Sequence, residues 1–291
     1  MPENTIRKYH LKDIAFINDF FERCHLAIYL NGNSFAFALL DDDLNKFMRF
    51  DSYQKEDADS KSISLHNGFE DALQETGYAD QSFKSVKVLV ENPYSTLVPN
   101  EQFDATRLKE YLTFTHHPLE NPGHVINHNP VSVIEAHSIF LYPAAITSVL
   151  KKHFRSFKIY HQSCVMISAI MALKNSKIGK QVYVNLRSHS GDILFLDDGR
   201  LRFFNSFSFE KNTDFVFFVL ESLQRLNLDP EFIRVILLGN IVARDEMYQE
   251  LYRFIKNLGF ISRNSHFQYS PVLDSLPSHL FFNLFSIPKC E

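Results

Sequence analysis

Three short runs of apolar residues near the start of the chain, separated by polar turns, are typical of β-strands. Residues 25–31 (HLAIYLN) and 34–40 (SFAFALL) are rich in β-branched and aromatic residues, and the turn-forming Asn-Gly-Asn at 31–33 joins them. Residues 44–50 (LNKFMRF) follow after a second turn. The pattern therefore predicts a three-stranded antiparallel meander.

The pattern changes period after this meander. Apolar residues of 64–76 recur at helical spacing, with Gly77 after them, which predicts an amphipathic helix. Residues 85–91 (SVKVLVE) are typical of a buried strand, and residues 100–114 contain a second amphipathic helix. The first half is thus predicted to run β-β-β-α-β-α.

The second half repeats this order of elements. Three strands, a helix, a buried strand and a helix are predicted, in that order, at residues 181–187, 191–197, 200–207, 212–226, 232–239 and 244–259. We expect a cap at Asn212 or Thr213 for the first of these helices, and Gly259 to close the second. Aligned without gaps, identical residues coincide: Leu30 with Leu186, Ser34 with Ser190, Leu40 with Leu196, Asp41 and Asp42 with Asp197 and Asp198, and Phe47 with Phe203. The shared order around these residues indicates a duplication.

Strand and helix patterns also occupy the segment between the halves. Residues 123–143 predict one or two strands, and residues 144–154 an amphipathic helix. Residues 163–175 are apolar on nearly every side, which is typical of a helix buried between other elements. We expect an α/β protein with domains at 1–160 and 161–291, the C-terminal segment packing back on the first through a short helix within 277–285.

Composition narrows the class of protein. Apolar residues make up 45% of the 291 residues and charged residues 22%, so a sizeable core is expected, filled by many of the 29 phenylalanines. A net charge of -4 makes nucleic acid an unexpected partner. The three cysteines form no C-x-x-C pair, so no disulfide framework or cysteine metal site is expected. The polar N-terminus and the lack of a long apolar run predict a cytoplasmic protein without a transmembrane segment.

A duplicated meander followed by alternating helices and strands resembles the actin-like ATPase superfamily, which includes actin, sugar kinases and heat-shock chaperones. The chain is most similar to the actin-like assembly proteins of type IV pili and type II secretion, where a strand and helix precede a buried helix, as residues 139–173 do here. It also resembles an uncharacterised bacterial family with this fold. The resemblance implies a duplicated actin-like ATPase (ribonuclease-H-like) fold, with two mixed-sheet domains flanking a cleft.

In that superfamily each meander begins with an Asp-x-Gly turn followed by small polar residues. The Asp holds Mg²⁺ through water, and the Gly lets backbone N–H groups approach the phosphates. Here Tyr29 and Asn31 occupy these two places in the first turn, and Asn185 and Arg187 occupy them in the second. The resemblance implies a degenerate nucleotide cleft, whose candidate residues are Asn31, Gly32, Asn33, Ser34, Arg187, Ser188, Ser190, Asp192, Gly239 and Asn240. The last two stand where the superfamily has a Gly-Gly that contacts adenosine.

With both carboxylates and both glycines replaced, efficient ATP hydrolysis is not expected. We assign no catalytic residue and no cofactor. The hypothesis is a non-enzymatic assembly or scaffold protein with a protein partner. The alternative is an ATP-binding protein or weak ATPase with an unconventional metal site, for which Asp41, Asp42 and Asp192 remain. Arg187 either faces a phosphate or is a solvated turn residue.

Five histidines crowd one segment: His116, His117, His124, His128 and His137. On a strand, His124 and His128 would share a face, and neutral imidazoles bind zinc. No Cys or Glu joins them at a recognised spacing. We therefore predict histidines of loops and an edge strand, and no metal site.

Overall fold

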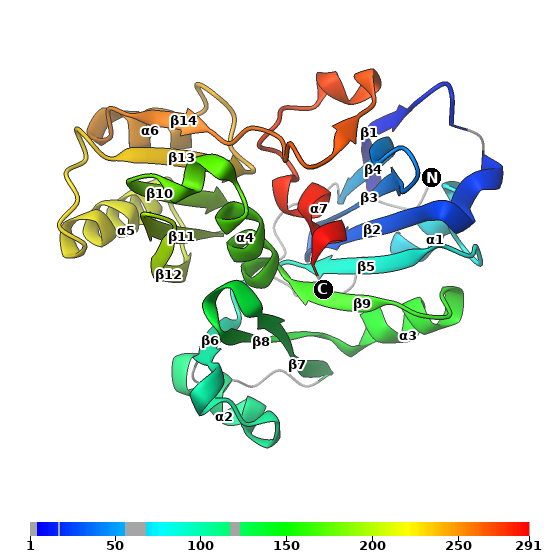
Figure 1. Cartoon of the computed structure of the whole chain (residues 1–291), viewed down its shortest axis with the longest axis horizontal. Helices are drawn as coiled ribbons and strands as arrows, with labels where there is room; N and C mark the ends of the chain where they lie inside the picture. Colours follow the sequence, from blue (N-terminus) through cyan, green and yellow to red (C-terminus); the bar gives the residue numbers. More distant parts are fainter. Residues whose placement is uncertain (1–4, 17, 56–67, 117–122, 291) are drawn as a thin grey trace. The chain divides into compact units, whose positions relative to one another are not determined.

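The computed structural model describes residues 5–16, 18–55, 68–116 and 123–290, and Figure 1 labels their main elements. The strands are β1 (Thr5–Lys12), β2 (Cys24–Leu30), β3 (Ser34–Asp41), β4 (Lys46–Lys55), β5 (Ser85–Val90), β6 (Ser95–Pro99), β7 (His124–Val131), β8 (Ala136–Pro143), β9 (Lys158–His161), β10 (Lys180–Leu186), β11 (Ser190–Asp197), β12 (Arg200–Ser208), β13 (Arg234–Gly239), β14 (Leu258–Phe260) and β15 (Gln268–Tyr269). The helices are α1 (Phe69–Glu75), α2 (Leu108–Thr115), α3 (Ala144–His153), α4 (Gln162–Met171), α5 (Asn212–Arg225), α6 (Glu246–Phe254) and α7 (Phe282–Ser286).

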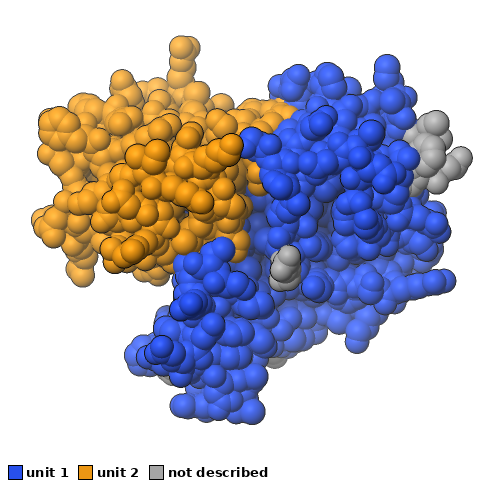
Figure 2. Space-filling view, viewed as in Figure 1, with its two compact units in different colours: residues 1–166, 265–275, 283–291 blue, residues 167–264, 276–282 orange. Residues whose placement is uncertain are grey.

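The chain divides into two compact units, coloured separately in Figure 2. Unit 1 comprises Met1–Met166, Ser265–Ser275 and Asn283–Glu291, and unit 2 comprises Ile167–Asn264 and Leu276–Phe282. The C-terminal part of the chain therefore contributes to both units.

The main sheet of unit 1 is mixed, with the strand order β1-β4-β3-β2-β5-β9, and β15 also pairs with β4. Strands β2, β3 and β4 form the predicted antiparallel meander, with Ile28 opposite Phe37. Strands β5 and β9 extend the sheet in parallel on the β2 side. The sheet thus joins a hairpin meander to parallel strands that need helical crossovers.

Helix α1 packs on this sheet through its apolar face. Phe69, Ala72 and Leu73 are fully buried. The Phe69 ring lies 5.8 Å from that of Phe37 and 5.6 Å from that of Phe35, measured between centroids. Each large side chain buried in this way stabilises the fold by about 1.5–3 kcal/mol, so the phenylalanine-rich hairpin is the centre of the unit 1 core.

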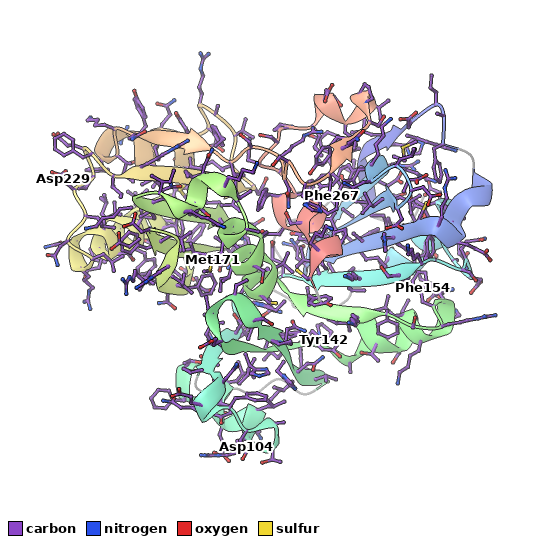
Figure 3. All side chains as sticks on the ribbon, viewed as in Figure 1. Asp104, Tyr142, Phe154, Met171, Asp229 and Phe267 are labelled. Carbon is purple, nitrogen blue, oxygen red and sulfur yellow. The ribbon has the colours of Figure 1, made fainter. Side chains whose placement is uncertain are left out.

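A smaller antiparallel sheet, with the order β6-β8-β7, also belongs to unit 1. Helix α2 covers it through Leu112, which packs with Val98, Ile139 and Leu141. Asp104, labelled in Figure 3, accepts a hydrogen bond from the backbone N–H of Thr106 and so caps the short 3-10 turn before α2. This sheet therefore has a small core of its own.

Unit 2 contains a second mixed sheet, with the order β12-β11-β10-β13-β14. Its first three strands form an antiparallel meander, while β13 and β14 are added in parallel. Helix α5 packs on it through Phe215, Val219 and Leu223, all fully buried. A Cβ at Gly191 would lie 2.3 Å from the Phe215 ring, so this glycine makes room for the helix.

The structure contains every predicted element of both halves in the predicted sequence, but it adds strand β6 between β5 and α2 in the first half and corrects several boundaries. Helix α6 ends at Phe254, and Gly259 lies in β14, because residues 258–260 pair with β13 instead of continuing the helix. Helix α5 begins at Asn212 with Lys211 as its cap, so neither Asn212 nor Thr213 is the cap that was expected. Strand β1 was not predicted, and it pairs with β4 along an edge. The part of the predicted helix before Gly68 lies outside the described residues.

Aromatic rings attach the C-terminal residues of unit 1 to its main sheet. The Phe47 ring lies 4.8 Å from the ring of Phe285 and 5.2 Å from that of Phe267, which Figure 3 labels. Lys87 Nζ donates a hydrogen bond to the backbone oxygen of Pro288 (2.9 Å).

Helix α4 is buried along nearly its whole length, as its apolar sequence predicts. In the described part of the chain, no helix has the length and apolar character needed to cross a membrane.

Candidate functional site

The turn between β2 and β3 is closed by one side chain. Asn31 Oδ1 accepts hydrogen bonds from the backbone N–H groups of Asn33 (2.9 Å) and Ser34 (2.7 Å), and from the Ser34 hydroxyl (3.1 Å). The Asn31 N–H donates to the backbone oxygen of Ser34 (3.0 Å). This is an Asx turn, in which a carboxamide satisfies backbone donors. Gly32 lies in the same turn, so all four candidates of unit 1 are adjacent.

The other end of the Asn31 side chain is also held. Its Nδ2 donates to the hydroxyl oxygen of Tyr29 (2.6 Å), and that hydroxyl donates to the carboxylate of Glu91 (2.6 Å). Glu91 directly follows β5, which pairs in parallel with β2. A chain of hydrogen bonds therefore runs from the end of β5 to the turn. Tyr29 stands where the resembling superfamily has a carboxylate.

The corresponding turn of unit 2 contains a buried ion pair. Arg187 Nη1 contacts Asp192 Oδ2, and Arg187 Nε donates to the Ser190 hydroxyl (2.8 Å). Arg187 is 7% exposed and Asp192 is fully buried. The guanidinium is thus fixed by its own hairpin and is not the solvated side chain weighed for this position.

Further side chains complete the contacts of Asp192. Asn185 Nδ2 donates to Oδ2 of this carboxylate (2.9 Å), and the Ser206 hydroxyl donates to Oδ1 (2.6 Å). Because the register places Asn185 opposite Asp192 and Asp192 opposite Ser206, the three β-strands of the meander each contribute one member. These donors replace the hydrogen bonds to water that the carboxylate loses on burial.

Gly239 and Asn240 lie beside this network at the end of β13. Gly239 has φ +85, and a Cβ there would lie 2.3 Å from the Leu186 oxygen and 2.6 Å from Asn185 Oδ1. The Asn240 N–H donates to the same Leu186 oxygen (2.8 Å). The close approach of two strand ends therefore requires glycine here.

The ten candidates form two groups. The four of the first turn lie together in unit 1. In unit 2, Arg187, Ser190 and Asp192 are in contact, Gly239 and Asn240 pack on the end of β10, and Ser188 is exposed in the turn between β10 and β11. The structure therefore brings candidates together within each turn, and residues outside the candidate set complete their hydrogen bonds.

Sequence reasoning missed Glu91, Ser206 and His279. The backbone oxygen of His279 accepts from the Gly239 N–H (3.1 Å), and its Nε2 pairs with the Ile241 oxygen (2.6 Å). Burial lowers the pKa of the His279 imidazole. No sequence signal indicated these residues, because each joins its turn only through strand pairing or a distant segment.

A buried polar cluster in unit 1 also escaped prediction. Asn129 Nδ2 donates to the Ile159 oxygen (2.9 Å), and Asn129 Oδ1 accepts from the His161 N–H (2.9 Å). His161 Nδ1 lies 2.8 Å from the Ser163 hydroxyl, which lies 2.7 Å from that of Ser138. His161 and Ser163 are fully buried, so this histidine–serine pair joins β9 to the smaller sheet and does not face solvent.

The described histidines of residues 116–137 do not form a single cluster. His116 Nε2 pairs with the backbone oxygen of Ser95 (3.0 Å), while His128 and His137 contact each other. Burial, and secondly the charge of His128, lowers the pKa of His137. Among the residues that the structure describes, no three or more His, Cys, Asp or Glu side chains cluster to hold a metal ion. His117 lies outside the described residues.

We predict that Asn31→Ala lowers the free energy of unfolding more than Ser34→Ala does. Asn31→Ala leaves two backbone donors and one hydroxyl without their acceptor, and should lower the free energy of unfolding by about 1–2 kcal/mol. Ser34→Ala removes only the hydroxyl bond and should cost about 0.5 kcal/mol or less. Urea unfolding followed by circular dichroism measures both. Equal losses would contradict the closing role of the Asn31 carboxamide.

Two solved structures of other proteins have a similar fold. A Bacteroides thetaiotaomicron protein with an actin-like ATPase fold and unknown function matches with a TM-score of 0.72 at 20% identity, covering 84% of this chain and 94% of its own. The structure of a PilM-PilN type IV pilus biogenesis complex matches with a TM-score of 0.62 at 10% identity, covering 91% of this chain and 98% of that one. No curated protein matches the sequence.

The protein therefore has the actin-like ATPase fold: a mixed α/β fold with a mixed sheet in each unit, as its duplicated pattern predicts. A family model covers most of the chain, from residue 15 to residue 258. The chain belongs to the family described as "Protein of unknown function (DUF3822)".

Proposed function

We propose that this protein is a non-enzymatic scaffold or assembly protein, built on an actin-like body whose phosphate turns no longer bind nucleotide. The observation that carries the proposal is the closure of both turns by their own side chains. Asn31 takes up the backbone donors of the first turn, and Asp192 takes up the guanidinium of Arg187 in the second. A phosphate would have to displace these bonds before it could form its own.

The carboxylates that favoured an unconventional metal site are engaged as well. Asp41 accepts from Arg23 Nη2 (2.6 Å), and Asp42 pairs with His25 Nε2 (2.9 Å) and with Lys84. Asp192 is held by Arg187. A divalent cation would compete with a positively charged partner at each carboxylate, which makes Mg²⁺ binding costly.

Fold similarity to a protein solved in a type IV pilus biogenesis complex supports a role in assembly. We expect the partner to be a protein and not a nucleic acid, because the net charge of -4 provides no general attraction to phosphate backbones.

Nucleotide binding tests the first half of the proposal. We expect no change in melting temperature with 1 mM Mg-ATP or Mg-ADP. If ATP bound with a dissociation constant of about 10 μM, it would add about 2.7 kcal/mol at that concentration and raise the melting temperature by about 5–10 °C. A shift of that size would favour the alternative, an ATP-binding protein.

Affinity isolation from the native cell tests the second half. A tagged chain should recover a protein in constant stoichiometry, and the two purified proteins should re-form the complex during size-exclusion chromatography. Recovery of the chain alone, under conditions that preserve other complexes of that cell, would contradict a scaffold role.

A further inference from the structure

Two histidines on neighbouring strands of the smaller sheet of unit 1 face each other through their Nδ1 atoms, which lie 3.2 Å apart. His128 is on β7 opposite Ile139, and His137 is on β8 opposite Pro130. They are therefore diagonal neighbours of an antiparallel pair, a separation that long side chains bridge. The register of two paired strands, and not a loop, brings them together.

Phe103 fixes the orientation of both rings. It stacks on His137 with centroids 3.7 Å apart and planes 10° apart, and it lies 4.8 Å from the His128 ring. Both histidines are half-buried. A site whose ligand rings are already held by packing needs little ordering when a ligand binds.

The separation of the nitrogens matches metal coordination. Imidazole nitrogens lie about 2.0–2.1 Å from Zn²⁺, so two of them at a tetrahedral angle are about 3.3–3.4 Å apart. A hydrogen bond between two imidazoles has a similar length. The pair can thus hold either one shared proton or one metal ion.

We propose that His128 and His137 bind a late first-row divalent ion, such as Zn²⁺ or Cu²⁺, through their Nδ1 atoms. Imidazole is a preferred ligand of these ions. Among the residues that the structure describes, no third His, Cys, Asp or Glu joins the pair, so these residues supply two ligands of the ion. Neither histidine belongs to the two turns.

Metal binding changes the tautomer of one ring. In the metal-free pair, one imidazole donates its Nδ1 proton to the Nδ1 lone pair of the other. When the ion binds, that proton passes through solvent to Nε2 of the same ring, and both Nδ1 lone pairs bind the metal. No net proton is released from two neutral rings.

Histidine side-chain NMR of the ¹⁵N-labelled full chain, titrated with Zn²⁺, tests the proposal. We expect one Zn²⁺ per chain, and both rings as Nε2–H tautomers when saturated. A persistent Nδ1–H signal in excess Zn²⁺ would overturn the proposal. This readout needs only the wild-type protein, so it decides the question even where a variant fails to fold.

Affinity measured by competition with a chromophoric chelator gives the second readout. His128→Gln and His137→Gln should each weaken Zn²⁺ binding at least about tenfold, equivalent to about 1.4 kcal/mol. The matched control is His116→Gln, from the same segment but paired with the Ser95 oxygen, and it should bind as wild type does. Equal affinity in all four folded proteins would show that the ion binds elsewhere and would overturn the assignment.

Discussion

Asp51→Ala should lower the free energy of unfolding by about 3–5 kcal/mol. Asp51 lies on β4 with no exposed surface, and its carboxylate accepts from Arg49 Nε (2.7 Å), Arg7 Nη2 (2.8 Å) and His10 Nδ1 (2.5 Å). Arg49 is itself only 4% exposed. Removing the carboxylate leaves a buried guanidinium without its counter-charge, which costs more than the pair contributes. Urea unfolding measures the loss.

Asp71→Ala is the matched control, because Asp71 is an exposed residue of α1. We expect a change within about 0.5 kcal/mol. Asp51→Asn, which keeps the shape but removes the charge, should fall between the two variants. If Asp51→Ala and Asp71→Ala unfolded at the same urea concentration, the buried cluster would have no structural role.

Gly239→Ala should have the second large effect, a loss of about 2–4 kcal/mol. The residue adopts φ +85, which costs a side-chain-bearing residue about 1–2 kcal/mol, and the new Cβ would press on the Leu186 oxygen. The strand ends must separate to relieve this contact. Amide hydrogen exchange should report the separation as faster exchange at the Asn240 N–H, which donates to that oxygen.

Gly259→Ala in the same unit is its control. A Cβ there meets no atom within 4 Å. We expect its free energy of unfolding to stay within about 0.5 kcal/mol of that of the wild type. A Gly239→Ala protein as stable as this control would show that strand spacing at Leu186 is adjustable, and that the glycine is not needed for packing.

The strand-forming runs and turn residues of 25–50 and 181–207 predicted both meanders, because hairpins join strands that are neighbours in the sequence. Element ends were less predictable. Nothing within residues 244–259 shows that the helix stops at Phe254, since that boundary depends on pairing of 258–260 with β13. Strand β1 was not predicted, because its residues are largely polar and it lies at an edge of the main sheet.

For the two candidate turns, too, the sequence identified the residues, and the structure showed what they contact. The sequence indicated that Tyr29, Asn31, Asn185 and Arg187 stand at the chemical positions of the resembling superfamily. It left open whether Arg187 is solvated or faces a phosphate. Only the paired strands bring Asp192 and Ser206 to its turn, and the guanidinium is held there.

By itself, then, the sequence determined the order of elements, the duplication and the residues that occupy the two turns, because these depend on local pattern and on side-chain type. The tertiary structure decided what those residues contact: Glu91 beside Tyr29, Asp192 beside Arg187, and His137 beside His128. The physical reason is that hydrogen bonds and ion pairs act over about 3 Å, whereas the partners lie on different strands. Only register and packing bring them within that distance.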